Sequence, residues 1–296
     1  MGGSVTWDRW GSDYLGRDSQ GSARAHREEC VIEALKHELA SAASVEGKTN
    51  RAREFLQILA LKSLSDRDAF SRVAFIGGTA LRVIFGVRRF SEDLDFSIVN
   101  SKGYDFRDIC DGLVKTFRLN GLNAGLDKKN GKIVNSAFLS FPGLPHALGL
   151  SGHKGEKLSI KIEVDTRPPA GWKAQTSILN RTYLFNVSHY DLPSMFAGKL
   201  HACFYRKYTK GRDIYDLFWY LGKKVRPNLE LLNNAIAQSH GKSPGITESN
   251  LKEFMLKAPS HIDLNAARKD VERFLEDKSE LRLFNADSLA AAINSI

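Results

Sequence analysis

The sequence predicts an α/β (α+β) protein in which a core with a mixed sheet is followed by a largely helical C-terminal half. Alternating strand patterns occur near 93–99 and 157–165, with helical periodicity before and between them. From Asp191 onward, nearly every segment repeats its apolar residues at helical spacing. With 296 residues, 42% of them hydrophobic and 26% charged, the chain is long enough for one large or two modest globular domains.

The first half is predicted to alternate helices and strands. "RVAFI" at 72–76 is a short apolar strand that ends at a Gly-Gly pair, and Thr79 can cap the helix that follows. The expected elements are helices at about 25–43 and 48–64, a strand at 72–76, a helix to Phe85, a strand at 93–99, a helix at 104–119, and strands at 132–140 and 157–165. A segment dense in Gly and Pro at 141–156 predicts a long loop between the last two strands.

Three regions are expected along the chain. Residues 1–23 are rich in Gly, Ser and Asp and predict a flexible arm. Residues 24–185 form the α/β core, and residues 186–296 form a helical domain that contributes Lys199 and Asp213. The two larger regions join near residues 170–190, and a polar break at 240–249 interrupts the second.

The charge balance favours a polyanionic partner. Lys and Arg number 43 against 34 Asp and Glu, a net charge of +9 with a pI of about 9.4. Such an excess suits nucleic acid or a phosphorylated substrate. The three cysteines are far apart and predict neither a disulfide framework nor a structural zinc site. No segment is apolar enough for a membrane span, so we expect a cytoplasmic protein without a membrane partner.

Two aspartates stand in the strand that follows the Gly-Gly pair. Because side chains alternate along a strand, Ser91, Asp93 and Asp95 share one face, and Leu94 and Phe96 lie on the core face. Adjacent carboxylates repel each other, and a divalent cation such as Mg²⁺ is the usual reason to keep them. The alternative is an exposed acidic strand edge, which a bare Asp-x-Asp pattern favours.

The later strand "SIKIEVDTR" has a second acidic face. Lys161, Glu163 and Asp165 alternate with Ile160 and Ile162. A third carboxylate on a neighbouring strand would complete a metal-binding trio. Ordinary alternation between core and solvent explains this strand equally well when it is taken alone.

A lysine in the helix after Asp191 lies beside an apolar stripe. Asp191 is a candidate N-cap, and Lys199 stands between Phe196 and Leu200. Its ammonium therefore needs a phosphate or a buried carboxylate. The alternative is a lysine that reaches solvent along the apolar surface, with Arg212 and Asp216 as a surface pair one turn apart.

Taken in order, these stretches resemble the nucleotidyltransferases of the DNA polymerase β superfamily. The motifs are "FIGGTALR…RFSEDLDF", "KIEVD", a helix bearing Lys199, and "RDIYDL". They are most similar to the AbiEii-type toxins, a family that includes the MenT-type mycobacterial toxins. The resemblance covers roughly residues 70–225 and implies a polymerase-β-like nucleotidyltransferase core.

The resemblance also implies roles for single residues. The residues expected to hold the NTP are Gly77, Gly78 and Thr79, through their backbone N–H groups, together with Ser91 and Lys199. Asp93 and Asp95 are expected to bind Mg²⁺. Two acids compete for the third position, Glu163 as the catalytic acid that activates the attacking hydroxyl and Asp165 as a metal ligand. Asp213 is expected to order the site by holding Lys199 or Arg212.

The implied reaction transfers a nucleoside monophosphate from an NTP to an acceptor hydroxyl and releases pyrophosphate. MenT-like toxins extend the 3′ end of tRNA and block translation. The expected partners are therefore tRNA, as the RNA acceptor, and a cognate antitoxin. Basic residues and tyrosines interleaved over 199–226 are consistent with an RNA acceptor. Two alternatives remain, a small-molecule nucleotidyltransferase of the aminoglycoside type, which the charge of +9 disfavours, and an inactive module that binds nucleic acid.

Overall fold

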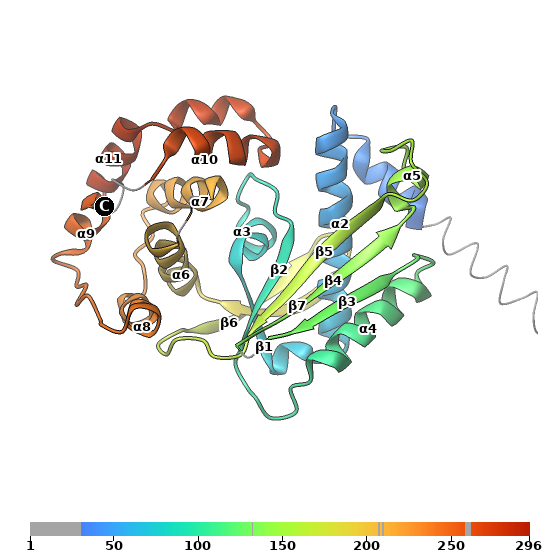
Figure 1. Cartoon of the computed structure of the whole chain (residues 1–296), viewed down its shortest axis with the longest axis horizontal. Coiled ribbons are helices and arrows are strands. Elements are labelled where there is room, and N and C mark those ends of the chain that lie inside the picture. Colours follow the sequence, from blue (N-terminus) through green and yellow to red (C-terminus); the bar gives the residue numbers. More distant parts are fainter. Residues whose placement is uncertain (1–30, 132, 207, 209, 258–261) are drawn as a thin grey trace, which may run out of the picture.

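A computed structural model describes residues 31–131, 133–206, 208, 210–257 and 262–296. Its centre is a seven-stranded sheet with the order β3-β4-β5-β2-β1-β7-β6 (Figure 1). The strands are β1 (Val73–Ile76), β2 (Asp93–Ile98), β3 (Gly125–Asn130), β4 (Val134–Pro142), β5 (Lys157–Asp165), β6 (Ala174–Asn180) and β7 (Leu184–Tyr190). The expected arm at 1–23 lies outside the described residues, as does the start of the first expected helix.

The sheet is mixed, and its register brings the acidic strands together. β2 runs antiparallel to β1 and parallel to β5, so that Asp95 lies opposite both Ile76 and Glu163. Leu94 and Phe96 are 0% and 2% exposed, which confirms them as the core face of β2. Their burial fixes the register, because a shift by one residue would turn both aspartates into the core.

Helices cover the sheet and then form the second half of the chain. The helices are α2 (Val45–Asp66), α3 (Gly77–Phe85), α4 (Phe106–Leu119), α5 (Leu144–Ala147), α6 (Leu192–Tyr205), α7 (Gly211–Gly222), α8 (Leu229–His240), α9 (Leu251–Lys257), α10 (Leu264–Val271) and α11 (Ala286–Asn294), with short 3₁₀ turns at Ala69–Ser71, Glu272–Phe274 and Lys278–Leu283. α2 packs against β5, β7 and α4, and α6 packs against α7 and α8. In Figure 1, α3 lies between the sheet and the helical half.

The predicted fold class is confirmed, and three local predictions differ from the structure. The junction expected near 170–190 is a β-hairpin, β6 and β7, which extends the sheet, so the boundary expected between 185 and 186 falls inside β7. β3 was not predicted, and the loop expected at 141–156 contains the short helix α5. Five of the seven residues of β6 are exposed, so this strand has no alternation of apolar and polar residues to reveal it.

The prediction of Thr79 as a helix cap was wrong. α3 begins at Gly77, with Ile76 at the N-cap position. Thr79 is fully buried, and its hydroxyl donates a hydrogen bond to the carbonyl oxygen of Asp93. The residue therefore ties the first turn of α3 to the start of β2.

Within the described part of the chain, no helix combines the length and the apolar character that a membrane span requires.

Candidate active site

A pocket of about 660 Å³ lies where β1, β2 and β5 meet α3, α6, α7 and α8. Its volume is in the range of small-molecule and cofactor sites. Nine of the ten site residues expected from the sequence line it, namely Gly77, Gly78, Ser91, Asp93, Asp95, Glu163, Asp165, Lys199 and Asp213. The tenth, Thr79, lies behind the pocket wall in the contact with Asp93 described above.

The Gly-Gly turn is shaped by its neighbours. Gly77 has φ of +79°, a left-handed conformation that favours glycine, and a Cβ there would lie 3.0 Å from Asp95 Cβ and closer still to Oδ2. A Cβ at Gly78 would lie 2.7 Å from Nη2 of Arg89 and 3.1 Å from the Ser91 hydroxyl. The backbone at the start of α3 therefore approaches the aspartates closely, and its free N–H groups suit an anion.

The two aspartates of β2 face the pocket together, as predicted. Burial raises the pKa of Asp95 to about 7, and repulsion from Asp93 and Glu163 acts in the same direction. Burial raises the pKa of Asp93 as well, although Arg212 opposes this shift. Ionising both carboxylates is thus unfavourable in the free protein, and a bound cation would relieve this cost.

Neither candidate for the third acid, Glu163 or Asp165, completes a metal-binding trio with Asp93 and Asp95 in the structure. Glu163 lies opposite Asp95 in the register, and its Oε1 is 2.7 Å from Lys161 Nζ. Asp165 lies opposite Ser97, and its carboxylate accepts a hydrogen bond from the backbone N–H of Arg167. Within the described residues, no three His, Cys, Asp or Glu side chains are grouped closely enough to hold a metal ion by themselves.

Lys199 is held by carboxylates from the neighbouring helix. Asp191 caps α6 by accepting a hydrogen bond from the Ser194 N–H, as predicted. Lys199 Nζ lies 2.7 Å from Oδ1 of Asp213 and 2.9 Å from Oδ2 of Asp216. Although burial disfavours the charged ammonium, Asp213 and Asp216 outweigh it and raise the pKa of Lys199. Lys199 therefore does not reach solvent along the apolar surface.

Asp213 joins two cations, and one of them is Lys199, a partner expected for it. Besides Lys199, its carboxylate binds Arg206, with Nη1 at 2.6 Å from Oδ2. Burial alone would raise the pKa of Asp213, but Lys199 and Arg206 hold that pKa below its ordinary value. Arg212 instead lies 3.3 Å from Glu92 and stacks over Phe274, with 4.3 Å between Cζ and the ring centroid.

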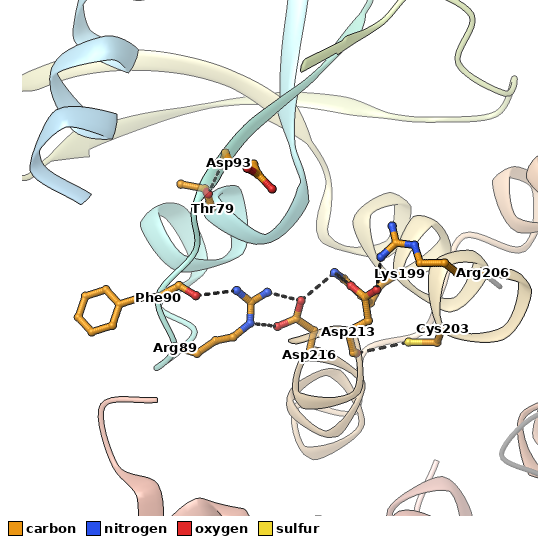
Figure 2. Close-up of polar contacts among 9 residues, drawn as sticks. All are labelled: Thr79, Arg89, Phe90, Asp93, Lys199, Cys203, Arg206, Asp213 and Asp216. Carbon is orange, nitrogen blue, oxygen red and sulfur yellow. Dashed lines mark hydrogen bonds and ion pairs between the residues drawn. The ribbon is translucent and has the colours of Figure 1, made fainter. Parts of the chain in front are cut away.

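Two residues of this network were not expected from the sequence. Figure 2 shows Arg89 directed at Asp216, with Nε 2.7 Å from Oδ1 and Nη2 on the other oxygen. Both side chains are buried, so the alternative of a surface pair between Arg212 and Asp216 does not hold. The sequence did contain one indication that Asp216 is buried, because Asp213, Asp216 and Tyr220 share a helix face that borders the core stripe.

The aromatic and basic residues after Lys199 divide between core and surface. Tyr215 is buried and donates a hydrogen bond to Glu280, so it is unable to stack on a base. Tyr208 is 62% exposed and lies within 6 Å of the cationic groups of Arg206 and Lys210. Arg206, Lys210 and Arg212 line the pocket, whereas Lys223, Lys224 and Arg226 lie on the surface beyond the other end of α7.

Comparison with known proteins identifies the family. Residues 59–293 match the model of the nucleotidyl transferase AbiEii toxin family, which belongs to type IV toxin–antitoxin systems. The chain belongs to this family. No functionally curated protein matches the chain. The AbiEii match covers α3, both acidic strands and the helices that carry Lys199 and Asp213, so the pocket lies entirely within the family region.

Two solved structures align with most of the chain. A candidate nucleotidyltransferase from H. pylori aligns with a TM-score of 0.52 at 21% identity, over 82% of this chain and 92% of that chain. A structure of JHP933 from Helicobacter pylori aligns with a TM-score of 0.49 at 21% identity, over 83% of this chain and 90% of that chain. The first alignment confirms a nucleotidyltransferase-like fold, and the family match makes this chain a nucleotidyltransferase toxin of the AbiEii type.

Proposed function

We propose that this AbiEii-family protein is a Mg²⁺-dependent enzyme that transfers a nucleoside monophosphate from an NTP to the 3′ end of tRNA and thereby blocks translation. The observation that supports this most is the shared pocket, in which Asp93 and Asp95 lie with the first turn of α3 and with Lys199. Paired carboxylates suit a divalent cation, whereas helix N–H groups and an ammonium suit polyphosphate.

The acidic side fits Mg²⁺ in its chemistry. Asp93 and Asp95 offer oxygen ligands from one strand face, and the raised pKa of Asp95 reflects its burial and its repulsion from Asp93 and Glu163, which a bound cation would offset. The Gly77 turn approaches Asp95 so closely that a side chain on residue 77 would fill the space beside the carboxylate. When bound, the ion would neutralise phosphate charge and polarise the α-phosphorus.

The chain's own residues perform the remaining tasks. The N–H groups of Gly77 and Gly78 bind the triphosphate, together with the Ser91 hydroxyl and Lys199 of the same pocket, whereas buried Thr79 supports the turn from behind. Glu163 lies next to Asp95 in the register, so we assign it, ahead of Asp165, as the group that takes the proton of the attacking hydroxyl. The acceptor oxygen then bonds to the α-phosphorus, and pyrophosphate leaves.

An RNA acceptor is supported by the basic side chains at the pocket. Arg206, Lys210 and Arg212 line it, and the exposed ring of Tyr208 offers a surface on which an unpaired base can stack. The family description, a toxin of type IV toxin–antitoxin systems, also leads us to infer a cognate antitoxin.

The test incubates purified protein with each labelled NTP, MgCl₂ and tRNA, either intact or stripped of its 3′-terminal adenosine. We expect lengthened tRNA with at least one NTP, no product with EDTA, and loss of activity with added salt. Asp93→Asn protein is the inactive control, and Glu163→Gln should lose more activity than Asp165→Asn. Labelling of a small molecule or of the protein, with no tRNA lengthened, would contradict the proposed acceptor.

A further inference from the structure

A largely buried ion network connects Arg89, which lies between α3 and β2, to α6 and α7 (Figure 2). Arg89 is 1% exposed and binds both carboxylate oxygens of Asp216, which is fully buried. Asp216 also contacts Lys199, so one carboxylate serves two cations. Because the carboxylate is shared, the loss of one cation changes the electrostatic environment of the other.

Arg89 lies beside the Gly-Gly turn and is one of the residues that line the pocket. Its Nη1 donates a hydrogen bond of 3.0 Å to the Phe90 carbonyl, which fixes the plane of the guanidinium. Its Nη2 occupies the space in which Gly78 would carry a side chain. A cation at the amino end of a helix is unfavourable by itself, because the helix dipole is positive at that end, and the carboxylate of Asp216 compensates for it here.

The formal charges of the network do not cancel. Arg89, Lys199 and Arg206 contribute three positive charges, and Asp213 and Asp216 contribute two negative charges. The remaining +1 borders the pocket at α3 and α6. Part of this charge is screened, because Arg206 is 33% exposed and Lys199 also attracts Asp95, and the remainder favours an anion in the pocket.

We propose that Arg89 and Asp216 are positioning residues for the substrate's triphosphate: Arg89 neutralises Asp216, so that Lys199 is held by two carboxylates yet keeps its charge for the phosphates. This inference rests on the proposed nucleotide transfer and specifies what prepares Lys199 for it. Without Arg89, the two carboxylates cancel Lys199 and Arg206, and the network is neutral. Without the charge on Asp216, the network carries +2, but Lys199 loses one of its two anchors.

The two partners should therefore act in opposite directions on anion binding. Arg89→Met should weaken binding of a polyphosphate, whereas Asp216→Asn should strengthen it and still lower kcat, because Lys199 is less well placed. The double variant Arg89→Met/Asp216→Asn returns the network to +1 and should regain affinity. A pair that only stabilises the fold would instead weaken binding in all three variants.

The experiment measures the binding of inorganic tripolyphosphate with MgCl₂ by calorimetry, with no RNA present. We expect about tenfold weaker binding in Arg89→Met, tighter binding than wild type in Asp216→Asn, and affinity within about threefold of wild type in the double variant. Arg82→Met is the matched control, since Arg82 also pairs with two carboxylates, Glu54 and Glu276, but lies outside the pocket lining. It should lower the melting temperature and leave the affinity unchanged.

Equal affinity in Arg89→Met and wild type would overturn the inference, as would a double variant that binds no better than Arg89→Met. If Arg89→Met fails to fold, Asp216→Asn decides, because weaker binding there contradicts the charge argument. Failure of the wild-type protein to bind tripolyphosphate or any NTP would contradict the proposed function itself. Binding without a variant effect would contradict the inference alone.

Discussion

The two sides of the pocket differ in how their charges are satisfied. On the helical side, Lys199 and Arg206 are paired with Asp213, and Arg89 is paired with Asp216. On the sheet side, Asp93 and Asp95 repel each other, and burial raises the pKa values of both. The helical side is therefore assembled in the free protein, whereas we propose that a cation completes the sheet side.

This difference separates the roles of the two halves of the chain. Paired groups hold their positions before the substrate arrives, which reduces the reorganisation needed during the reaction. Unpaired carboxylates raise the free energy of the free protein and lower it again when a cation binds. Variants on the sheet side should thus abolish the chemistry without harming the fold, whereas variants on the helical side should affect both.

The largest effect is expected from Asp95→Asn. Loss of an oxygen ligand should lower the transfer rate by about 10³-fold or more, because the charge on the phosphates is no longer neutralised. The melting temperature should stay equal to that of wild type or rise, since the substitution removes a buried carboxylate beside Asp93. Transfer assays and thermal melts of the same preparation test both points. Transfer close to wild type would refute the role of this carboxylate.

Lys199→Met should have the next largest effect, and it should act on both activity and stability. Removal of one positive charge from a phosphoryl-transfer site costs about 10²-fold in kcat. The melting temperature should also fall, because Asp213 and Asp216 lose a shared partner. Lys199→Arg should recover stability better than activity, because a planar guanidinium and a compact ammonium contact phosphates differently. Unchanged kcat and nucleotide affinity would show that Lys199 is only structural.

Gly77→Ala should be more harmful than a glycine substitution outside the pocket. Both Gly77 and Gly86 have positive φ, +79° and +73°, so alanine at either position costs roughly 1–2 kcal/mol of backbone strain. Only at Gly77 does the new Cβ collide with Asp95, whereas nothing lies within 4 Å at Gly86. Gly86→Ala should therefore keep its activity, and Gly77→Ala should lose most of it. Similar activities in the two variants would contradict the close approach of turn and carboxylate.

The smallest effect concerns stability and pH in the absence of nucleotide. The pKa of Asp95 is about 7 in the folded protein against 3.8 in an unperturbed side chain, so the folded state keeps a proton that the unfolded chain releases. Stability without metal should thus fall as the pH rises from about 4 to 7. Because Mg²⁺ competes with this proton, it should raise the melting temperature by a few degrees more at pH 8 than at pH 6. Asp95→Asn protein should lack that difference, and equal shifts at both pH values in wild type would count against the metal site.

Local patterns singled out Asp93, Asp95 and Lys199, and all three line the pocket. Alternation in β2 placed Asp93 and Asp95 on one face, and the apolar neighbours of Lys199 indicated that its ammonium needs a partner. The AbiEii motifs then predicted the order of the parts along the chain, which the family match confirms.

The sequence could not predict which side chains pair across the fold. Arg89 and Asp216 are 127 positions apart, and only the packing of α7 against the turn after α3 brings them together. Judged by local spacing alone, Asp216 belongs to Arg212, four residues earlier, and that pairing does not hold. The hairpin of β6 and β7 escaped prediction for a related reason, since its exposed edge strand has no core face to impose a pattern.

The most direct test of the central claim is the titration of Asp95, followed by NMR of ¹³C-labelled aspartate carboxyl carbons and assigned with Asp95→Asn protein. In metal-free protein, the account predicts a pKa of about 7, raised by burial and by repulsion from Asp93 and Glu163. Saturating MgCl₂ should lower this pKa strongly, because the ion binds the ionised carboxylate. An ordinary pKa near 3.8 that Mg²⁺ leaves unchanged would contradict the claim that the sheet side of the pocket is completed by a cation.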